Sequence, residues 1–474
     1  MIDTFSIRCS ILRLAFSGKL TQQCMSDGNA RSILSRISPK KSVEQTENTP
    51  YEIPDTWAWV KLADLYTINP KVDAGDAKDA AFIPMERVGA GFNRTFSFER
   101  QSWVQASKNH TKFSDGDVAF AKISPCFENR KSFIAQGLPN GIGGGTTELI
   151  VLRQGEMLPE YTYYLVLDQR FIATGKASYK GTVGQQRVQS DVIKNYFVPV
   201  PPYPEQQRIV EKIEQAFSAL DSIDALQAKY ADNLAVLKSK LIDAAIRGKL
   251  TNQLPEDGTA EELYRQIQAE KDELAEKGEL YREKTIKKIS PEEIPYAIPQ
   301  NWIWTRLGEL SKVITKGSSP KWQGVNYTDA DNGILFITSE NVGNGRMLFD
   351  KRKYVQEQFN EIHPSSILQK GDILTNIVGA SIGRTALFDE DTDNANTNQA
   401  VCIVRLINKD VSAYILRYLC SNGAIQLMIG KVVDTARANL SLTSISNLMV
   451  PLPPLAEQQR IVMHLDEILK MIET

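Results

Sequence analysis

The sequence predicts an α+β protein: two similar globular domains joined by a pair of long antiparallel helices, with pseudo-two-fold, circularly permuted symmetry. Three observations predict this architecture. A long amphipathic stretch occupies residues 205–247, near the middle of the chain. Several motifs recur in the same order in both halves. The head and the tail of the central stretch recur at the two ends of the chain.

The central stretch is predicted to be one helix, because a proline run precedes it and Gly248 follows it. Pro204 suits the first helical position, and Gly248 suits a left-handed C-cap. At about 1.5 Å per residue the helix would be about 65 Å long. Its apolar residues follow a heptad-like seam with one slip near Leu226: Ile209, Ile213, Ala216, Leu220, Ile223, Leu226, Tyr230, Leu234, Leu237, Leu241 and Ala244.

Length and composition indicate a globular protein, and the 474 residues are enough for two or more domains. We expect neither a signal peptide nor a membrane span, because no apolar run is long enough. Five cysteines without a C-x-x-C pair favour a reducing compartment, so a cytoplasmic protein is expected. The net charge of −2 gives no support to nucleic-acid binding, so any basic surface would have to be local.

Three repeated motifs define the two halves. PVPPYPEQQRIV at 199–210 recurs as PLPPLAEQQRIV at 451–462. The repeat also pairs YEIPDTWAWVKLADL at 51–65 with YAIPQNWIWTRLGEL at 296–310, and GKLTQQ at 18–23 with GKLTNQ at 248–253.

The repeat is circular, because the head of the central helix recurs at 457–474 and its tail recurs at 7–23. We therefore expect the two terminal segments to lie end to end and antiparallel to the central helix. The predicted order is an N-terminal helix completing the second long helix (1–23), a connector (24–50), a first globular domain (51–200), the central helix (201–250), a charged helical connector (251–295), a second globular domain (296–452) and a C-terminal helix (453–474).

Both globular domains are predicted to mix strands and helices. Each opens with a Pro-x-x-Trp-x-Trp motif and contains Gly-Asp before an apolar strand, at Gly116-Asp117 and at Gly371-Asp372. Shared landmarks with different interiors suggest one scaffold with two specificities. The predicted strands are Ala81–Val88, Val118–Ile123, Leu149–Arg153, Ile334–Thr338, Ile373–Val378 and Ala400–Leu406, and the predicted helices are Glu160–Thr174 and Ala413–Ile429.

Motifs for catalysis are missing. No Gly-Lys pair completes a P-loop, and the three histidines are scattered. The glycine run Gly141–Gly145 is interpreted as a flexible turn rather than a phosphate cradle. Val200-Pro201-Pro202-Tyr203 is similar to the D/N-P-P-Y/F motif of amino-methyltransferases but lacks its first residue, so we interpret it as the start of a helix. We predict no catalytic residue, no metal ligand and no cofactor in this chain.

Basic, amide and hydroxyl side chains cluster at corresponding places in the two domains. Arg and Lys suit guanine, Asn and Gln suit adenine, and Lys, Ser and Thr also suit phosphate. A solvated polar loop explains any single residue equally well, whereas two matched clusters favour DNA contact. The candidate DNA-binding residues are Lys122, Ser124, Arg130, Lys131, Lys180, Gln185, Gln186, Arg187, Asn376, Arg384, Lys431, Arg437 and Asn439.

This pattern resembles the specificity subunits of type I restriction–modification systems. The doubled P-x-P-P-x-x-E-Q-Q-R-I-V carries the resemblance, supported by the tryptophan motifs and the circular arrangement. It implies two α/β target-recognition domains that each read half of a split DNA site, and helices that set their spacing and dock two methylation subunits. Restriction subunits would join them. S-adenosylmethionine, ATP and Mg would be bound by these partners, and the complex, not this chain, would methylate adenine and cut DNA.

The residues leave two alternatives open. One is a coiled-coil scaffold with two ligand-binding domains and no DNA role, which the near-neutral charge favours and the matched clusters disfavour. The other is a self-contained methyltransferase or nuclease, which the incomplete Pro-Pro-Tyr motif disfavours. If DNA is read, a helix of about 65 Å spans about 19 base pairs, with unread base pairs between the two readers.

Overall fold

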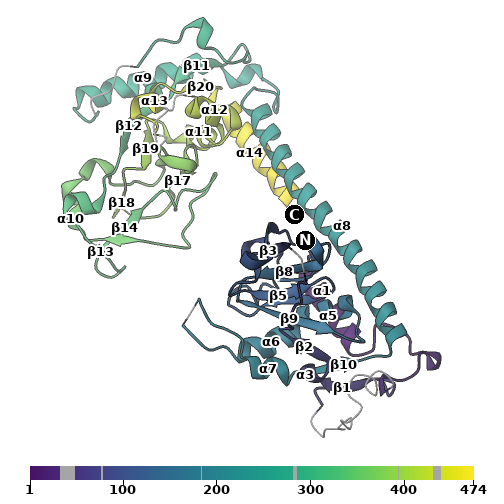
Figure 1. Cartoon of the computed structure of the whole chain (residues 1–474). Coiled ribbons are helices and arrows are strands. Elements are labelled where there is room, and N and C mark those ends of the chain that lie inside the picture. Colours follow the sequence, from purple (N-terminus) through teal and green to yellow (C-terminus); the bar gives the residue numbers. More distant parts are fainter. Residues whose placement is uncertain are drawn as a thin grey trace. The chain divides into compact units, whose positions relative to one another are not determined.

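A computed structural model of the chain divides into Met1–Lys229 (unit 1) and Tyr230–Thr474 (unit 2). Figure 1 shows that each unit contains helices and sheets. The structure describes residues 1–31, 49–75, 78–182, 184–280, 286–392, 394–430 and 439–473. Within these ranges, no helix combines the length and the apolarity that crossing a bilayer requires.

The long central helix is confirmed as α8, Tyr203–Ala245, which has 43 residues and contributes to both units. It begins and ends two residues before the predicted bounds. The heptad seam is wrong in the middle, where Leu226, Tyr230 and Leu237 are exposed. The core of unit 1 reaches α8 only as far as Ile223, and the core of unit 2 meets it from Leu241. No core of the described chain covers the stretch between them.

Unit 1 contains two four-stranded sheets and a two-stranded one. The antiparallel sheet has the order β2-β9-β6-β7, and the mixed sheet has the order β4-β3-β8-β5, in which β3 and β8 are parallel. The elements are α1 (Thr4–Phe16), β1 (Ala58–Lys61), α3 (Leu62–Leu65), β2 (Tyr66–Ile68), β3 (Asp79–Ile83), β4 (Glu99–Ser102), α4 (Trp103–Ser107), β5 (Thr111–Ser114), β6 (Val118–Ala121), β7 (Ser132–Ile134), β8 (Ile142–Gly145), β9 (Leu149–Gln154), α5 (Pro159–Leu167), α6 (Gln169–Ala177), α7 (Ser190–Lys194) and β10 (Phe197–Val200).

Unit 2 repeats most of these connections. Its antiparallel sheet has the order β12-β19-β16-β17, and its mixed sheet has the order β13-β15-β14-β18 with β14 and β18 parallel. The elements are α9 (Ala260–Glu276), β11 (Ile303–Arg306), β12 (Ser311–Lys316), β13 (Tyr327–Thr328), β14 (Ile334–Ile337), β15 (Tyr354–Val355), α10 (Gln358–Ile362), β16 (Ile373–Asn376), β17 (Thr385–Leu387), β18 (Ala395–Thr397), β19 (Val401–Leu406), α11 (Ser412–Leu419), α12 (Asn422–Ile429), α13 (Leu442–Ser446), β20 (Met449–Leu452) and α14 (Leu455–Glu473).

The repeated landmarks form the same contacts in both units. In unit 1 the carboxylate of Asp117 accepts from Arg153 at 2.7 Å, and in unit 2 that of Asp372 accepts from Arg405 at 2.7 Å. In each unit the aspartate of the Gly-Asp motif, which precedes one strand of the antiparallel sheet, therefore pairs with an arginine on the neighbouring strand.

Three predicted elements of the domains are wrong, and the predicted strand 81–88 ends at Ile83, before a 3-10 turn at Met85–Arg87. Each predicted helix, 160–174 and 413–429, is two helices, because Asp168 and Ser421 adopt extended backbone and cap a second helix with their side chains. The predicted glycine turn is the buried strand β8. A Cβ at Gly144 would lie 1.8 Å from the carbonyl oxygen of Ala106, so only glycine allows α4 to pack this closely.

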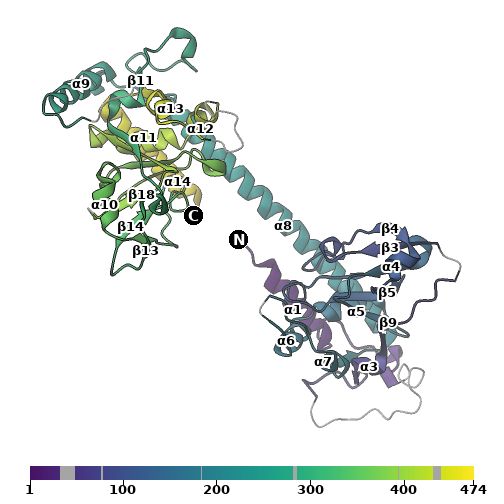
Figure 2. The same ribbon diagram turned by 60° about the vertical axis from the view of Figure 1, so that its left-hand side comes forward.

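The N-terminal helix α1 packs antiparallel on the first half of α8 within unit 1 (Figure 2). Thr4 Oγ1 donates to Asp224 at 2.5 Å, and Arg8 donates to Asp221 at 2.5 Å and pairs with Asp224 at 2.9 Å. Thr4, nearer the start of α1, thus contacts Asp224, and Arg8 reaches back to the earlier residue Asp221, so the two helices run in opposite directions. In unit 2, α14 lies beside the last turns of α8 in Figures 1 and 2, and both helices contribute to one core.

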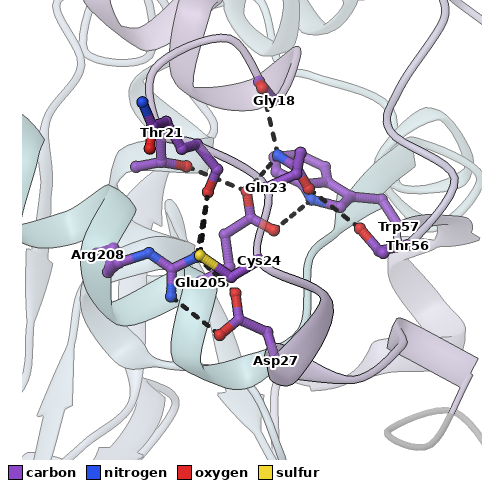
Figure 3. Close-up of polar contacts among 10 residues, drawn as sticks. Gly18, Thr21, Gln23, Cys24, Asp27, Thr56, Trp57, Glu205 and Arg208 are labelled. Atoms are coloured by element: carbon purple, nitrogen blue, oxygen red, sulfur yellow. Dashed lines mark hydrogen bonds and ion pairs between the residues drawn. The ribbon is translucent and has the colours of Figure 1, made fainter.

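A buried carboxylate fixes the start of α8 to the segment after α1 and to the residue before β1. Glu205 is 1% exposed and accepts from Trp57 Nε1 at 2.8 Å, Gln23 Nε2 at 2.6 Å and Thr21 Oγ1 at 3.1 Å (Figure 3). Next to it, Arg208 donates to Asp27 at 2.5 Å. The repeated Glu, Gln, Thr, Arg and Trp residues thus form one polar cluster, the helix anchor of unit 1.

Unit 2 carries the same anchor around Glu457, which begins α14. This carboxylate accepts from Trp302 Nε1 at 2.8 Å, Gln253 Nε2 at 2.7 Å and Thr251 Oγ1 at 3.1 Å. The motifs that recur in sequence therefore meet in space within each unit.

The charged connector contains α9, whose start is fixed by a capping box between Thr259 and Glu262. One face is buried at Leu263, Ile267 and Lys271, so α9 is amphipathic rather than solvated on all sides. Lys271 Nζ donates to the carbonyl oxygen of Gly308 at 2.8 Å. Residues 281–285 of the predicted charged connector lie outside the described residues.

Candidate nucleic-acid interface

The two predicted polar stretches of unit 1 meet in the structure. Lys122 and Ser124 follow β6, and residues 180–187 lie in the connection between α6 and α7. Ser124 N donates to the carbonyl oxygen of Gln186 at 2.8 Å, and a β-bridge joins Ile123 to Arg187. A further bridge joins Lys180 to Arg187, so the two ends of the second stretch pair with each other. Lys180, Gln185 and Arg187 are exposed, whereas Lys122, Ser124 and Gln186 are half-buried.

Arg187 is held by Glu148, a residue that the sequence did not single out. Arg187 Nη2 donates to Glu148 Oε1 at 2.8 Å, and Nε donates to Oε2 at 3.0 Å. These hydrogen bonds lower the pKa of the Glu148 carboxyl, and the charges of Arg187 and Lys122 lower it further. Glu148 lies far from Arg187 in the sequence, so no local spacing could reveal the pair.

Two other candidate DNA-binding residues of unit 1, Arg130 and Lys131, donate hydrogen bonds to groups within the protein. Arg130 is 6% exposed, and its guanidinium donates to the carbonyl oxygen of Leu167 at 2.9 Å and to Gln169 at 2.6 Å. It also lies over the ring of Phe5 on α1, so Arg130 faces the interior and does not belong to an exposed interface. Lys131 is half-buried, and its Nζ donates to the carbonyl oxygen of Met85 at 2.8 Å.

In unit 2 the structure brings Asn439 to the end of β16, because a β-bridge joins it to Val378. Asn439 and Arg384 are exposed. Asn376 is 0% exposed and donates to the carbonyl oxygen of Ser339 at 2.9 Å, so this side chain cannot meet a ligand at the surface. Lys431 and Arg437 lie outside the described residues.

A hollow of about 620 Å³ lies beside Arg384 in unit 2. Arg346, Asn344 and Arg384 contribute polar groups to its lining, and Ile382 and Ile425 contribute apolar ones. Arg346 is a basic residue that sequence reasoning missed, because the domains match poorly in this loop.

The exposed groups of both units are donors and amides suited to base edges and phosphates. Each set lies where a strand of the antiparallel sheet, β6 or β16, gives way to a loop. Among the residues that the structure describes, no three His, Cys, Asp or Glu side chains are grouped so that they could hold a metal ion.

Comparisons with known proteins agree with the division into two units. The family model described as the type I restriction modification DNA specificity domain matches residues 54–229 and 299–474. The type I restriction enzyme EcoEI specificity subunit of Escherichia coli is 29% identical over 550 residues, covering 100% of this chain and 90% of that protein. The EcoAI specificity subunit of Escherichia coli is 29% identical over 540 residues, covering 99% and 90%.

A solved structure with a similar chain belongs to the same kind of system by its description. It concerns complex assembly and conformational transition of the type I R-M system, and its matching chain has a TM-score of 0.63 at 19% identity. The match covers 90% of this chain and 93% of the other. At 19% identity it shows that the two chains share a fold and nothing further.

Proposed function

Because this chain belongs to the type I restriction–modification DNA specificity family, we propose that it is the subunit that selects the DNA sequence for such a complex. Residues 51–200 and 296–452 are the two target-recognition domains, and each reads one half of a bipartite site. The matches of the chain to known proteins give no support to the scaffold alternative.

One observation carries the proposal. Two units with closely related strand connections present different polar side chains at equivalent backbone positions. Two domains that read different DNA sequences require the same backbone arrangement with different side chains facing the bases. Of the predicted residues, the exposed ones are the best candidates for DNA contact: Lys180, Gln185, Arg187, Arg384 and Asn439.

The long helices set the distance between the readers. The segment 201–250 contains the continuous helix α8, and 1–23 with 453–474 supply the second, antiparallel one in circularly permuted order. The packing of α1 on α8 in unit 1 supports this arrangement, as does the shared core of α14 and α8 in unit 2. The segments 24–50 and 251–295 connect these helices to the domains.

The partners are double-stranded DNA, two methylation subunits and restriction subunits. The chain itself is non-catalytic, and the S-adenosylmethionine, ATP and Mg needed for adenine methylation and DNA cleavage bind to those partners in the cytoplasm. The exposed Leu226, Tyr230 and Leu237 on α8 support docking of a partner, because a soluble protein rarely leaves such apolar side chains in one stretch uncovered.

Selection from a randomised duplex pool tests this function. The chain assembled with its methylation subunits is expected to enrich a consensus of two short blocks separated by unread base pairs, measured at a stated salt concentration because phosphate contacts are salt-dependent. Enrichment of no sequence would contradict DNA reading. Methyl transfer by the chain alone would contradict the non-catalytic role.

A further inference from the structure

Backbone hydrogen bonds establish which residues of the two readers correspond. In unit 1, Lys122 N donates to the carbonyl oxygen of Glu148 at 2.8 Å, and Val188 N donates to that of Lys122 at 3.0 Å. In unit 2 the same two bonds run from Ile377 N to Ala400 at 2.9 Å and from Leu440 N to Ile377 at 2.8 Å. The corresponding pairs are therefore Lys122 and Ile377, Glu148 and Ala400, Arg187 and Asn439, and Val188 and Leu440.

The β-bridges give the same correspondence. Arg187 is bridged to Ile123 and Asn439 is bridged to Val378, each one residue after the corresponding pair Lys122 and Ile377. Both Arg187 and Asn439 are exposed. One backbone position thus presents an arginine in the first reader and an asparagine in the second.

The guanidinium of Arg187 keeps two N–H donors that are not used within the part of the chain that the structure describes. Nε and one N–H of Nη2 are taken by Glu148, and one N–H of Nη1 is taken by the carbonyl oxygen of Gln185 at 3.1 Å. Of the five N–H donors of an arginine, three are thus used, and two have no partner among the described residues. One N–H remains on each Nη, so the guanidinium keeps two donors for acceptors such as O6 and N7 of guanine.

Of the two corresponding positions, only the one beside the arginine carries a carboxylate. Glu148 holds Arg187 by its side, whereas the corresponding residue of unit 2 is Ala400, which has no group to orient a side chain. A bidentate partner fixes an otherwise flexible arginine and so reduces the entropy lost when it binds a base.

We propose that residues 187 and 439 are equivalent specificity positions: Arg187, held by Glu148 as a positioning residue, reads a guanine in one half-site, and Asn439 reads an adenine in the other. Asparagine matches adenine through one donor and one acceptor on N6 and N7. This inference rests on the proposed function and adds the base class and the positioning residue.

The test exchanges the two side chains in the assembled complex and repeats the selection from randomised duplexes. R187N is expected to replace guanine by adenine at one position of the first half-site, with a preference change of about tenfold to a hundredfold. N439R is expected to do the reverse in the second half-site. E148A is expected to weaken the guanine preference at the same position as R187N, without effect elsewhere.

The design contains its own controls. The half-site that a variant does not touch reports that the protein is folded and assembled. R87N is the matched control, because Arg87 is a similarly exposed arginine of unit 1 that pairs with Glu99 at 2.9 Å. Unchanged base preferences in R187N and N439R, with a two-part consensus still enriched, would overturn the inference alone. Failure of the unmodified complex to enrich any two-part consensus would instead overturn the proposed function.

Discussion

A seven-residue helical insertion in the middle of α8 is expected to lengthen the unread spacer by about three base pairs and to leave both half-sites unchanged. Seven residues add about 10 Å to a helix at 1.5 Å per residue, and base pairs are about 3.4 Å apart. The insertion turns the helix by only about 20°, so it changes the separation of the two readers more than their relative rotation.

The insertion disturbs neither core when it is placed between residues 226 and 237. The two cores end on α8 at Ile223 and at Leu241, and the exposed side chains between them make no core contact. The expected result is a loss of binding to the original site of at least about a hundredfold, because one half-site is then misplaced.

Binding is measured on duplexes that keep both half-sites and vary the spacer one base pair at a time. A same-length variant, D232A with N233A, is the control and should keep the original spacer. Altered half-sites, or an unchanged optimal spacer in the insertion variant, would contradict the separation of spacing from reading.

Removing one buried carboxylate is expected to destabilise one unit and spare the other. Glu205→Ala leaves the Trp57, Gln23 and Thr21 donors of the helix anchor without their acceptor, at a cost of about 3–5 kcal/mol. In a unit of this size the loss corresponds to a fall in melting temperature of about 10 °C.

Hydrogen exchange followed by mass spectrometry reports the two units separately. Glu205→Ala should speed exchange in residues 58–200 and leave 303–452 as in the unmodified chain, and Glu457→Ala should do the reverse. An equal effect of either substitution on both units would argue against two self-contained anchors.

Elements bounded by local signals could be predicted from the sequence. The prolines before α8 and Gly248 after it limited the helix to within two residues of its true bounds. The helix breaks at Asp168 and Ser421 were missed because capping depends on a side chain turning back to its own backbone, while the apolar pattern continues through both positions. The glycine strand β8 was missed because its reason, the close approach of α4, comes from another part of the chain.

The candidate interface could be predicted only as two polar neighbourhoods. The structure joins residues 122–124 to 180–187, and it places Asn439 beside the end of β16, as matched clusters would require. Arg130 and Asn376 have the same residue types as their exposed neighbours, so composition could not show that they face the interior. Glu148 was missed because its contact with Arg187 connects distant parts of the sequence, and Arg346 was missed because the two domains match poorly in its loop.

Replacing residues 51–200 by the corresponding segment of a relative with a different half-site is the most direct test of one reader acting independently of the other. The exchanged complex is expected to select one new half-site, with the second half-site and the spacer unchanged. A change in both half-sites, or in the spacer, would contradict an account in which each globular domain reads alone and α8 fixes their separation.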